Sequence, residues 1–122
     1  FIFNYAGSKA EAQEVNGEFI VLKGSMARKA HTHSFTNPYI QIRERLFTDG
    51  KLVNSENPDY WVFAQNIPFQ SPSTAAAIVG GAQLNGRQHW KVKTTGATYA
   101  QWQNDQIQKA EAAVLDQEVD GV

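Results

Sequence analysis

The sequence contains no cysteine and no long hydrophobic run. The absence of cysteine excludes disulfides, thiolate zinc sites, iron–sulfur ligation and a cysteine nucleophile. No apolar run approaches the roughly 18 residues that a membrane span requires, so we expect no membrane partner. With 42% hydrophobic and 19% charged residues, the 122-residue chain has the composition of one globular domain with its own core.

The N-terminus does not resemble a targeting peptide. The chain begins FIFNYAG, which has neither a basic start nor a long apolar stretch. Because residue 1 is phenylalanine rather than methionine, we interpret residues 1–122 as a single accessory domain excised from a longer protein.

Charge is unevenly distributed along the chain, although the net charge is only −1. No acidic residue occurs from residue 60 to residue 104, a segment that contains Arg87, Lys91 and Lys93. From residue 105 onward, five acidic residues accompany a single lysine. The small net charge argues against a wholly basic surface, but the asymmetry fits either a local polyanion-binding surface or a solvated acidic tail helix.

The spacing of apolar and turn residues predicts strands. Asn16 and Gly17 separate two extended runs and predict a hairpin, because a type I′ turn requires positive φ at both central positions. The second arm, residues 18–24, is apolar on both faces and should lie inside a sheet. Further strands are predicted at residues 1–5, 60–64 and 87–93, with a loop over 52–59 and a turn at Pro68.

The clearest predicted helix has Asn37 as its N-cap, Pro38 at its first position and Gly50 beyond its last. Its apolar stripe, with spacings of three and four residues, consists of Tyr39, Ile42 and Leu46. The residues expected to face outward are Arg43, Glu44 and Arg45.

Two more helices are predicted. Ser71 is placed to cap a short helix that starts at Pro72 and ends at Gly80-Gly81, and its three consecutive alanines allow close packing. An acidic amphipathic helix is predicted over residues 98–119, with a stripe of Tyr99, Trp102, Gln106, Ala110 and Val114 adjoined by Ile107 and Leu115. The predicted fold class is therefore α+β: a small, mainly antiparallel sheet with an N-terminal hairpin, packed by about three helices.

Candidates for catalysis or metal binding are few. His31 and His33 could offer two imidazoles, but no third ligand is visible nearby, and a surface loop explains the pair equally well. Ser25 does not lie in a Gly-x-Ser-x-Gly elbow, and the glycines of GGAQLNG lack the spacing of a nucleotide-binding loop. We therefore expect no catalytic residue, no metal and no cofactor, and keep a hydrolase using the two histidines as a weaker alternative.

The segment from Ser71 to Lys93 has features of an anion-binding site. A helix N-terminus offers free N–H groups and partial positive charge, to which Ser71 and Ser73 would add hydroxyls. In the predicted strand 87–93, Gln88, Trp90 and Val92 would share a core face, and His89, Lys91 and Lys93 a basic face. The alternative is that Ser71 only caps its helix, Trp90 fills the core and the basic residues keep the surface solvated.

Three stretches resemble a known family: GEFIVLKGSMAR, IRERLFTDGKL and FQSPSTAAAIVGGAQLNGRQHWKVKTTGATYAQWQ. In order and spacing they look like the uncharacterised domain found at the C-terminus of many bacterial GIY-YIG-type nucleases and restriction-linked proteins. The Ser-Pro-Ser-x-Ala-Ala, Asn-Gly and Trp elements also resemble, in part, the restriction enzyme adenine methylase-associated domain, which has been proposed to recognise modified DNA.

This resemblance implies a non-catalytic, cytoplasmic module that helps a nuclease or restriction–modification enzyme to engage DNA. Its partners would be DNA and a catalytic domain that precedes it in the same chain. The candidate nucleic-acid contacts are Ser71, Ser73, Asn85, Arg87, His89, Lys91 and Lys93.

A second hypothesis is a protein-interaction module. The acidic C-terminal helix would pack on the chain's own catalytic domain, on a homodimer mate or on another protein through Trp102, Ile107 and Val114.

Overall fold

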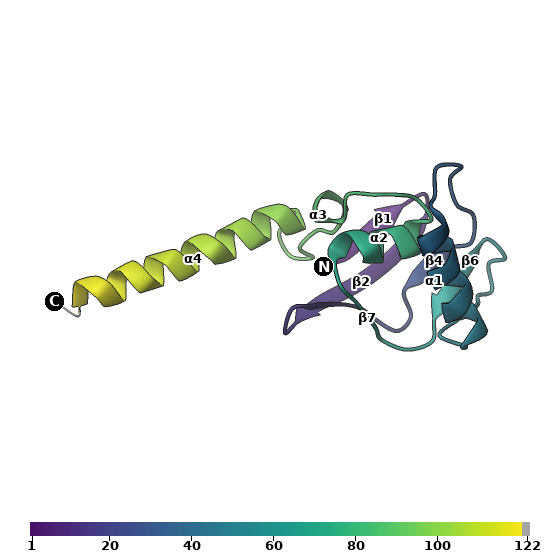
Figure 1. Ribbon diagram of the computed structural model, residues 1–122, viewed down its shortest axis with the longest axis horizontal. Helices are drawn as coiled ribbons and strands as arrows, with labels where there is room; N and C mark the ends of the chain where they lie inside the picture. The colour runs from purple at the N-terminus through teal and green to yellow at the C-terminus, as the bar shows by residue number, and fades with distance from the viewer. Residues whose placement is uncertain (121–122) are drawn as a thin grey trace.

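The computed structural model describes the backbone of residues 1–120 and the side chains of residues 1–114. Within this part it contains seven strands and four helices, which confirms the predicted α+β class (Figure 1). In chain order the elements are β1 (Ile2–Tyr5), β2 (Ser8–Val15), β3 (Glu18–Val21), β4 (Met26–Arg28), α1 (Asn37–Thr48), β5 (Leu52–Asn54), β6 (Tyr60–Phe63), β7 (Ile67–Phe69), α2 (Pro72–Gly80), α3 (Gly86–His89) and α4 (Tyr99–Asp120).

The described strands form two antiparallel sheets, where the sequence predicted one. The first has the order β1-β2-β3-β7 and the second β4-β6-β5. The predicted hairpin is confirmed: Asn16 and Gly17 connect β2 to β3 with φ values of 52° and 83°, as a type I′ turn requires. Strand β3 lies between β2 and β7, the interior position predicted from its two apolar faces.

Three short strands, β4, β5 and β7, were not predicted. The start of the expected loop over 52–59 is β5, and Pro68 lies within β7 rather than in a turn. Proline is tolerated there because β7 is an edge strand, where the missing N–H leaves no ladder bond unmade. A run of three residues is too short to show the alternation that marks a strand.

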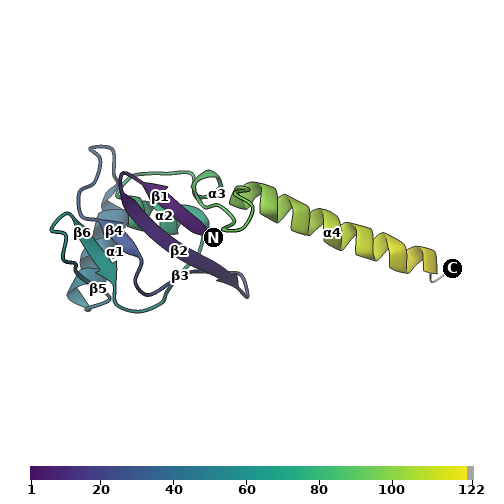
Figure 2. The same cartoon turned by 180° about the vertical axis from the view of Figure 1, so that it is seen from behind.

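Helix α2 packs against one face of the four-stranded sheet (Figure 1). Its alanines at residues 75–77 are fully buried, which confirms the close packing predicted for them. The sheet residues on this inner face are Phe3, Ala10, Ala12, Phe19 and Val21. The opposite face is not covered by a helix (Figure 2), and Ile2, Lys9 and Glu11 are exposed on it.

Helix α1 presents its predicted apolar stripe to the core, but two details differ. Asn37 is the first helical residue, and Thr36 precedes it as the N-cap without a side-chain bond. The prediction that Arg43 faces outward is wrong: its side chain is only 2% exposed. Arg43 follows Tyr39 by four residues and so lies on the buried face, where its guanidinium packs over the rings of Trp61, at 4.9 Å, and Phe35, at 5.6 Å.

The predicted strand over residues 87–93 is wrong in its first half, which forms the single helical turn α3. Asn85 caps this turn, since its Oδ1 accepts a hydrogen bond from the Arg87 N–H at 3.1 Å. Trp90 then extends into the core and is 0% exposed, as predicted, but Gln88 is exposed rather than buried.

Helix α4 projects away from the rest of the domain (Figures 1 and 2). Its first turn is attached, because Tyr99 is buried and Trp102 packs against the core. From residue 104 to residue 114 every side chain is exposed. Leu115, which was predicted to adjoin the apolar stripe, and the acidic residues Asp116, Glu118 and Asp120 lie outside the described side chains. None of the described helices combines the length and apolarity needed to cross a membrane.

Candidate functional site

Two serines at the start of α2 form hydrogen bonds within the protein. The hydroxyl of Ser71 accepts a hydrogen bond from the Thr74 N–H at 3.1 Å and donates one to Thr74 Oγ1 at 3.0 Å. The Oγ of Ser73 accepts a hydrogen bond from the Gly86 N–H at 3.0 Å. Both predicted hydroxyls therefore make contacts that fix the fold at this helix end.

The loop after α2 is anchored to this helix end by Trp90 and Gly86. The indole Nε1–H of Trp90 donates to the Pro72 carbonyl oxygen at 3.0 Å. A Cβ at residue 86 would lie 2.1 Å from the carbonyl carbon and oxygen of Pro72, so the backbone approach requires glycine. The Trp90 ring also contacts Phe3 and Phe19, with centroids 5.0 and 4.9 Å away. These contacts hold the backbone of residues 85–93 in one place.

Three of the seven predicted contact residues share one pocket, with a volume of about 410 Å³. They are Ser71, Ser73 and Arg87, and Arg87 is exposed at this site. Sequence reasoning missed the other charged member of the pocket, Glu14, because it lies on β2, far from Ser71 and Arg87 along the chain. The pocket therefore combines one cation, one carboxylate and the hydroxyls of a helix start.

Glu14 is held by Tyr99, whose hydroxyl donates a hydrogen bond to its carboxylate. Burial raises the pKa of Tyr99 to about 12, and the hydrogen bond and negative charge of Glu14 act in the same direction. The positive charge of Arg87 acts in the opposite direction. The tyrosine therefore remains a neutral donor at physiological pH and holds Glu14 in place on the pocket wall.

The other predicted residues lie outside this pocket. Asn85 is used as the cap of α3, and the Nδ1–H of His89 donates to the Asn85 carbonyl oxygen at 3.0 Å. The half-buried His89 ring also lies near the rings of Phe3 and Tyr5. The exposed Asn85 and the half-buried His89 therefore both stabilise the loop through these hydrogen bonds.

Lys91 and Lys93 lie beside the uncovered face of the four-stranded sheet. Lys91 forms two backbone hydrogen bonds with Ile2, of 2.8 and 2.9 Å, and so extends the sheet beyond β1. Ile2 is also paired with Glu11 on β2, and paired residues project from the same face. The Nζ of Lys93 forms a 3.2 Å ion pair with Glu11. Both lysine side chains are exposed at this edge.

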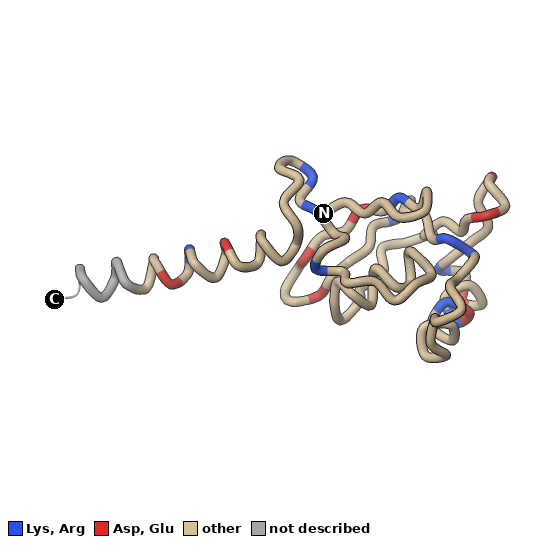
Figure 3. Tube along the Cα trace, turned by 90° about the horizontal axis from the view of Figure 1, so that it is seen from above, with Lys and Arg blue, Asp and Glu red and all other residues tan. Residues whose placement is uncertain are grey.

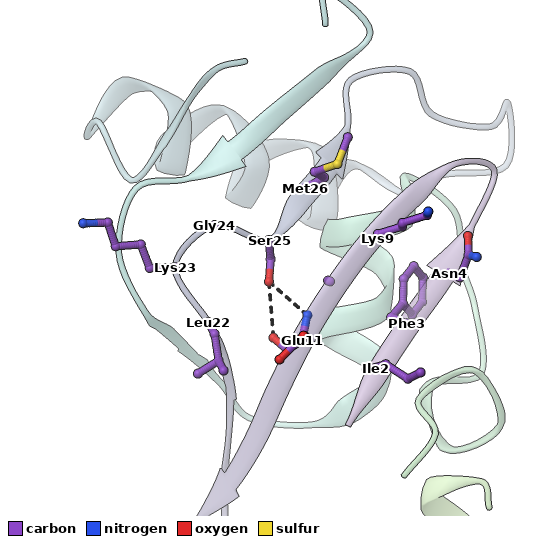
Figure 4. Close-up of a pocket in the computed structure, with 11 residues that line it drawn as sticks. Ile2, Phe3, Asn4, Lys9, Glu11, Leu22, Lys23, Gly24, Ser25 and Met26 are labelled. Atoms are coloured by element: carbon purple, nitrogen blue, oxygen red, sulfur yellow. Dashed lines mark hydrogen bonds between the residues drawn. The ribbon is translucent and has the colours of Figure 1, made fainter. Parts of the chain in front are cut away.

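A second hollow, of about 670 Å³, lies between β1, β2 and the segment before β4 (Figure 4). Its polar lining includes Asn4, Lys9 and Lys23. Ser25 fixes its floor, because the Oγ accepts a hydrogen bond from the Glu11 N–H at 3.0 Å and donates to the Glu11 carbonyl oxygen at 3.3 Å. Sequence reasoning missed Lys9, although the polar–apolar alternation of β2 could have placed it on an exposed face.

Most positive charge lies on the domain body rather than on α4 (Figure 3). Residues 1–104 contain ten of the eleven Lys and Arg but only seven of the twelve Asp and Glu. Among the described residues, no group of three or more His, Asp and Glu side chains is placed to hold a metal ion. With ten basic and seven acidic residues, residues 1–104 carry a net charge of +3.

Residues 1–103 match the sequence family described as the domain of unknown function DUF4357. Searches of curated proteins and of solved structures find no match to the chain.

Proposed function

The chain belongs to this family of domains of unknown function, and we propose that it is a non-catalytic DNA-binding module that assists a nuclease or restriction–modification enzyme. The resemblance of its three sequence stretches to the domain that accompanies GIY-YIG-type nucleases supports the choice of partner. In this proposal the chemistry takes place in the partner domain, and the present domain contributes affinity for the DNA backbone.

The observation that carries the proposal is the anchoring of residues 85–93. Trp90 is fully buried and bonded to Pro72, while Arg87, Lys91 and Lys93 on the same short segment are all exposed. Fixed backbone positions reduce the entropy lost when cations are ordered against a ligand. Phosphate contacts from such cations position a protein on a duplex.

A second group of cations lies at the uncovered face of the sheet. Lys9 lines the hollow on the uncovered face, and Lys91 lies at the edge of the same sheet. Glu11 is paired with Ile2, as Lys91 is, and its ion pair with Lys93 partly neutralises its charge. No acidic residue interrupts the segment from residue 60 to residue 104. These features support contact with a polyanion despite the net charge of −1.

Fluorescence anisotropy with a labelled 20-base-pair duplex tests this function. We expect Arg87→Gln and Lys91→Gln each to weaken binding several-fold, because each removes one phosphate contact. Lys109→Gln, the same charge change on α4, is the matched control and should have little effect. Undetectable binding by the wild type at low salt, or an equal loss in all three variants, would contradict the proposal.

The projecting helix favours a second candidate function, a protein-interaction module. Ile107 and Val114 are each 52% exposed and lie seven residues apart, on one side of α4. Trp102, by contrast, packs on the domain body and cannot belong to the same free surface. Hydrogen exchange of the chain joined to the proposed nuclease domain tests this candidate. Protection of residues 104–114 on joining would support it, and unchanged exchange would contradict it.

A further inference from the structure

The loop between β4 and α1 presents an exposed imidazole on a stack of aromatic rings. This loop, residues 29–36, projects beside α1 (Figure 1). The ring of His31 stacks on Phe35 with centroids 5.4 Å apart, and Phe35 stacks on Tyr39 at 5.6 Å. Phe35 is only 6% exposed, whereas His31 is exposed. The stack therefore leads from the core to a ring at the surface.

The orientation of His31 is fixed by hydrogen bonds in the loop. Its Nδ1–H donates to the Thr32 carbonyl oxygen at 3.1 Å, and the Phe35 N–H donates to the same oxygen. The Thr32 N–H in turn donates to Gly81 at the end of α2, at 2.9 Å. These bonds hold one face of the imidazole against Phe35, so a planar ligand could stack on it with little loss of conformational entropy.

The buried Arg43 packs against Phe35, the middle ring of the stack. Its guanidinium lies over Phe35 and over Trp61, and within the described residues its Nε and Nη2 atoms have no hydrogen-bond acceptor. Its positive charge is therefore not neutralised by a paired carboxylate. The charge of Arg43 makes the electrostatic potential near the loop more positive, and its effect is larger because the buried site has a reduced dielectric constant.

The charge around the loop favours an anionic ligand. No acidic residue occurs from residue 19 to residue 43, while the half-buried Arg28 and Lys29 lie three and two residues before the exposed ring. The Arg28 Nε–H donates to the Ala30 carbonyl oxygen at 3.3 Å, which holds its guanidinium near the loop. Asp59 is the acidic residue at the base of the loop, where its carbonyl oxygen accepts from the Lys29 N–H. An aromatic platform beside cations is the arrangement that binds unpaired bases of nucleic acids.

We propose that His31 is a stacking platform for one unpaired nucleobase, with Arg28 and Lys29 contacting the adjacent phosphates. The inference rests on the proposed DNA-binding function and adds a preference for single-stranded or locally unpaired DNA. It uses a surface separate from the 410 Å³ pocket, because the loop contacts the C-terminal end of α2 whereas Ser71 and Ser73 lie at its start. Unpaired bases would thus be bound at one end of α2 and backbone phosphate at the other.

The test is anisotropy of the full chain with a fluorescein-labelled 12-nucleotide single strand and with a blunt duplex. Stacking on one aromatic ring predicts that His31→Ala weakens single-strand binding by about 10-fold. The duplex affinity should change by less than twofold. His31→Phe keeps a stacking ring without an ionisable group and should retain most of the affinity. The matched control is His33→Ala, since His33 is exposed on the same loop and carries the same titratable group.

The outcomes separate the two proposals. Binding of duplex but not of single strand, or equal affinities for His31→Ala and His33→Ala, would overturn the stacking site and leave the DNA-binding function intact. If His31→Phe loses as much single-strand affinity as His31→Ala, the charge of the imidazole rather than stacking of its ring binds the strand. That result would also overturn the stacking site. Absence of binding to both forms by the wild type would overturn both proposals. Circular dichroism of each variant verifies that the loop change has not unfolded the domain.

Discussion

The indole N–H of Trp90 donates a 3.0 Å hydrogen bond to the carbonyl oxygen of Pro72, the first residue of α2. This bond joins two segments that are 18 residues apart and places the exposed Arg87 beside the start of α2. The geometry of the candidate DNA contacts therefore depends on a core residue.

Trp90→Phe removes this bond while keeping most of the buried ring. We expect a loss of about 2 to 3 kcal/mol in unfolding free energy, because the Pro72 carbonyl loses its partner and a small cavity remains. Urea denaturation measures this loss in unfolding free energy. Trp102→Phe, at a half-buried ring, should cost less than half as much. If the two variants lose equal unfolding free energy, the hydrogen bond from Trp90 to Pro72 contributes little to stability.

Gly86→Ala tests the close approach of α3 to α2. A Cβ there would lie 2.1 Å from Pro72 backbone atoms, so the two segments must separate. We expect destabilisation of more than about 2 kcal/mol, comparable with severe overpacking of a core. Gly17→Ala is the comparison, since its φ is +83° but no atom lies within 4 Å. That change should cost only about 1 kcal/mol, for the unfavourable φ alone. Thermal denaturation of both variants would show the difference, and a well-tolerated Gly86→Ala would contradict the packing.

Local signals in the sequence predicted α2 and the β2–β3 hairpin correctly. Ser71 caps α2 and Gly81 ends it with a φ of 68°, as their residue types indicated. The single turn α3 has no helical signal in the sequence, because four residues do not establish a helical period. The spacing of Arg43 from Tyr39 indicates the buried face, whereas its polarity indicates the surface, and the spacing is the signal that the structure follows. The pairing of Glu14 with Tyr99 joins residues 85 positions apart, and no local pattern could reveal it.

Arg43→Met tests the cost of the buried guanidinium. Burial, with a smaller effect of the Arg28 charge, lowers the pKa of Arg43 to about 10, which reflects an unfavourable environment for the cation. Methionine fills a similar volume without a charge to desolvate, so we expect stabilisation by about 1 kcal/mol. Arg45→Met, at an exposed position on the same helix, should leave stability almost unchanged. Clear destabilisation by Arg43→Met would show that the contacts with Phe35 and Trp61 outweigh the desolvation.

Tyr99 should make stability fall at high pH. Its pKa is raised from 10.0 to about 12 in the folded chain, so the folded state retains a proton that the unfolded state has lost. The resulting stabilisation is fully present below pH 10 and is lost as the pH rises through 12. Difference absorbance at 295 nm should show a phenol titrating near pH 12 that disappears in Tyr99→Phe. An unchanged titration in that variant would contradict the assignment.

The salt dependence of DNA binding tests the central claim most directly. If Arg87, Lys91 and Lys9 each neutralise one phosphate, the logarithm of the binding constant should fall against the logarithm of salt concentration with a slope of about −3. The Arg87→Gln, Lys91→Gln double variant should reduce this slope to about −1. No measurable binding at low salt, or a slope that is the same in the double variant, would contradict a role for these cations in holding DNA.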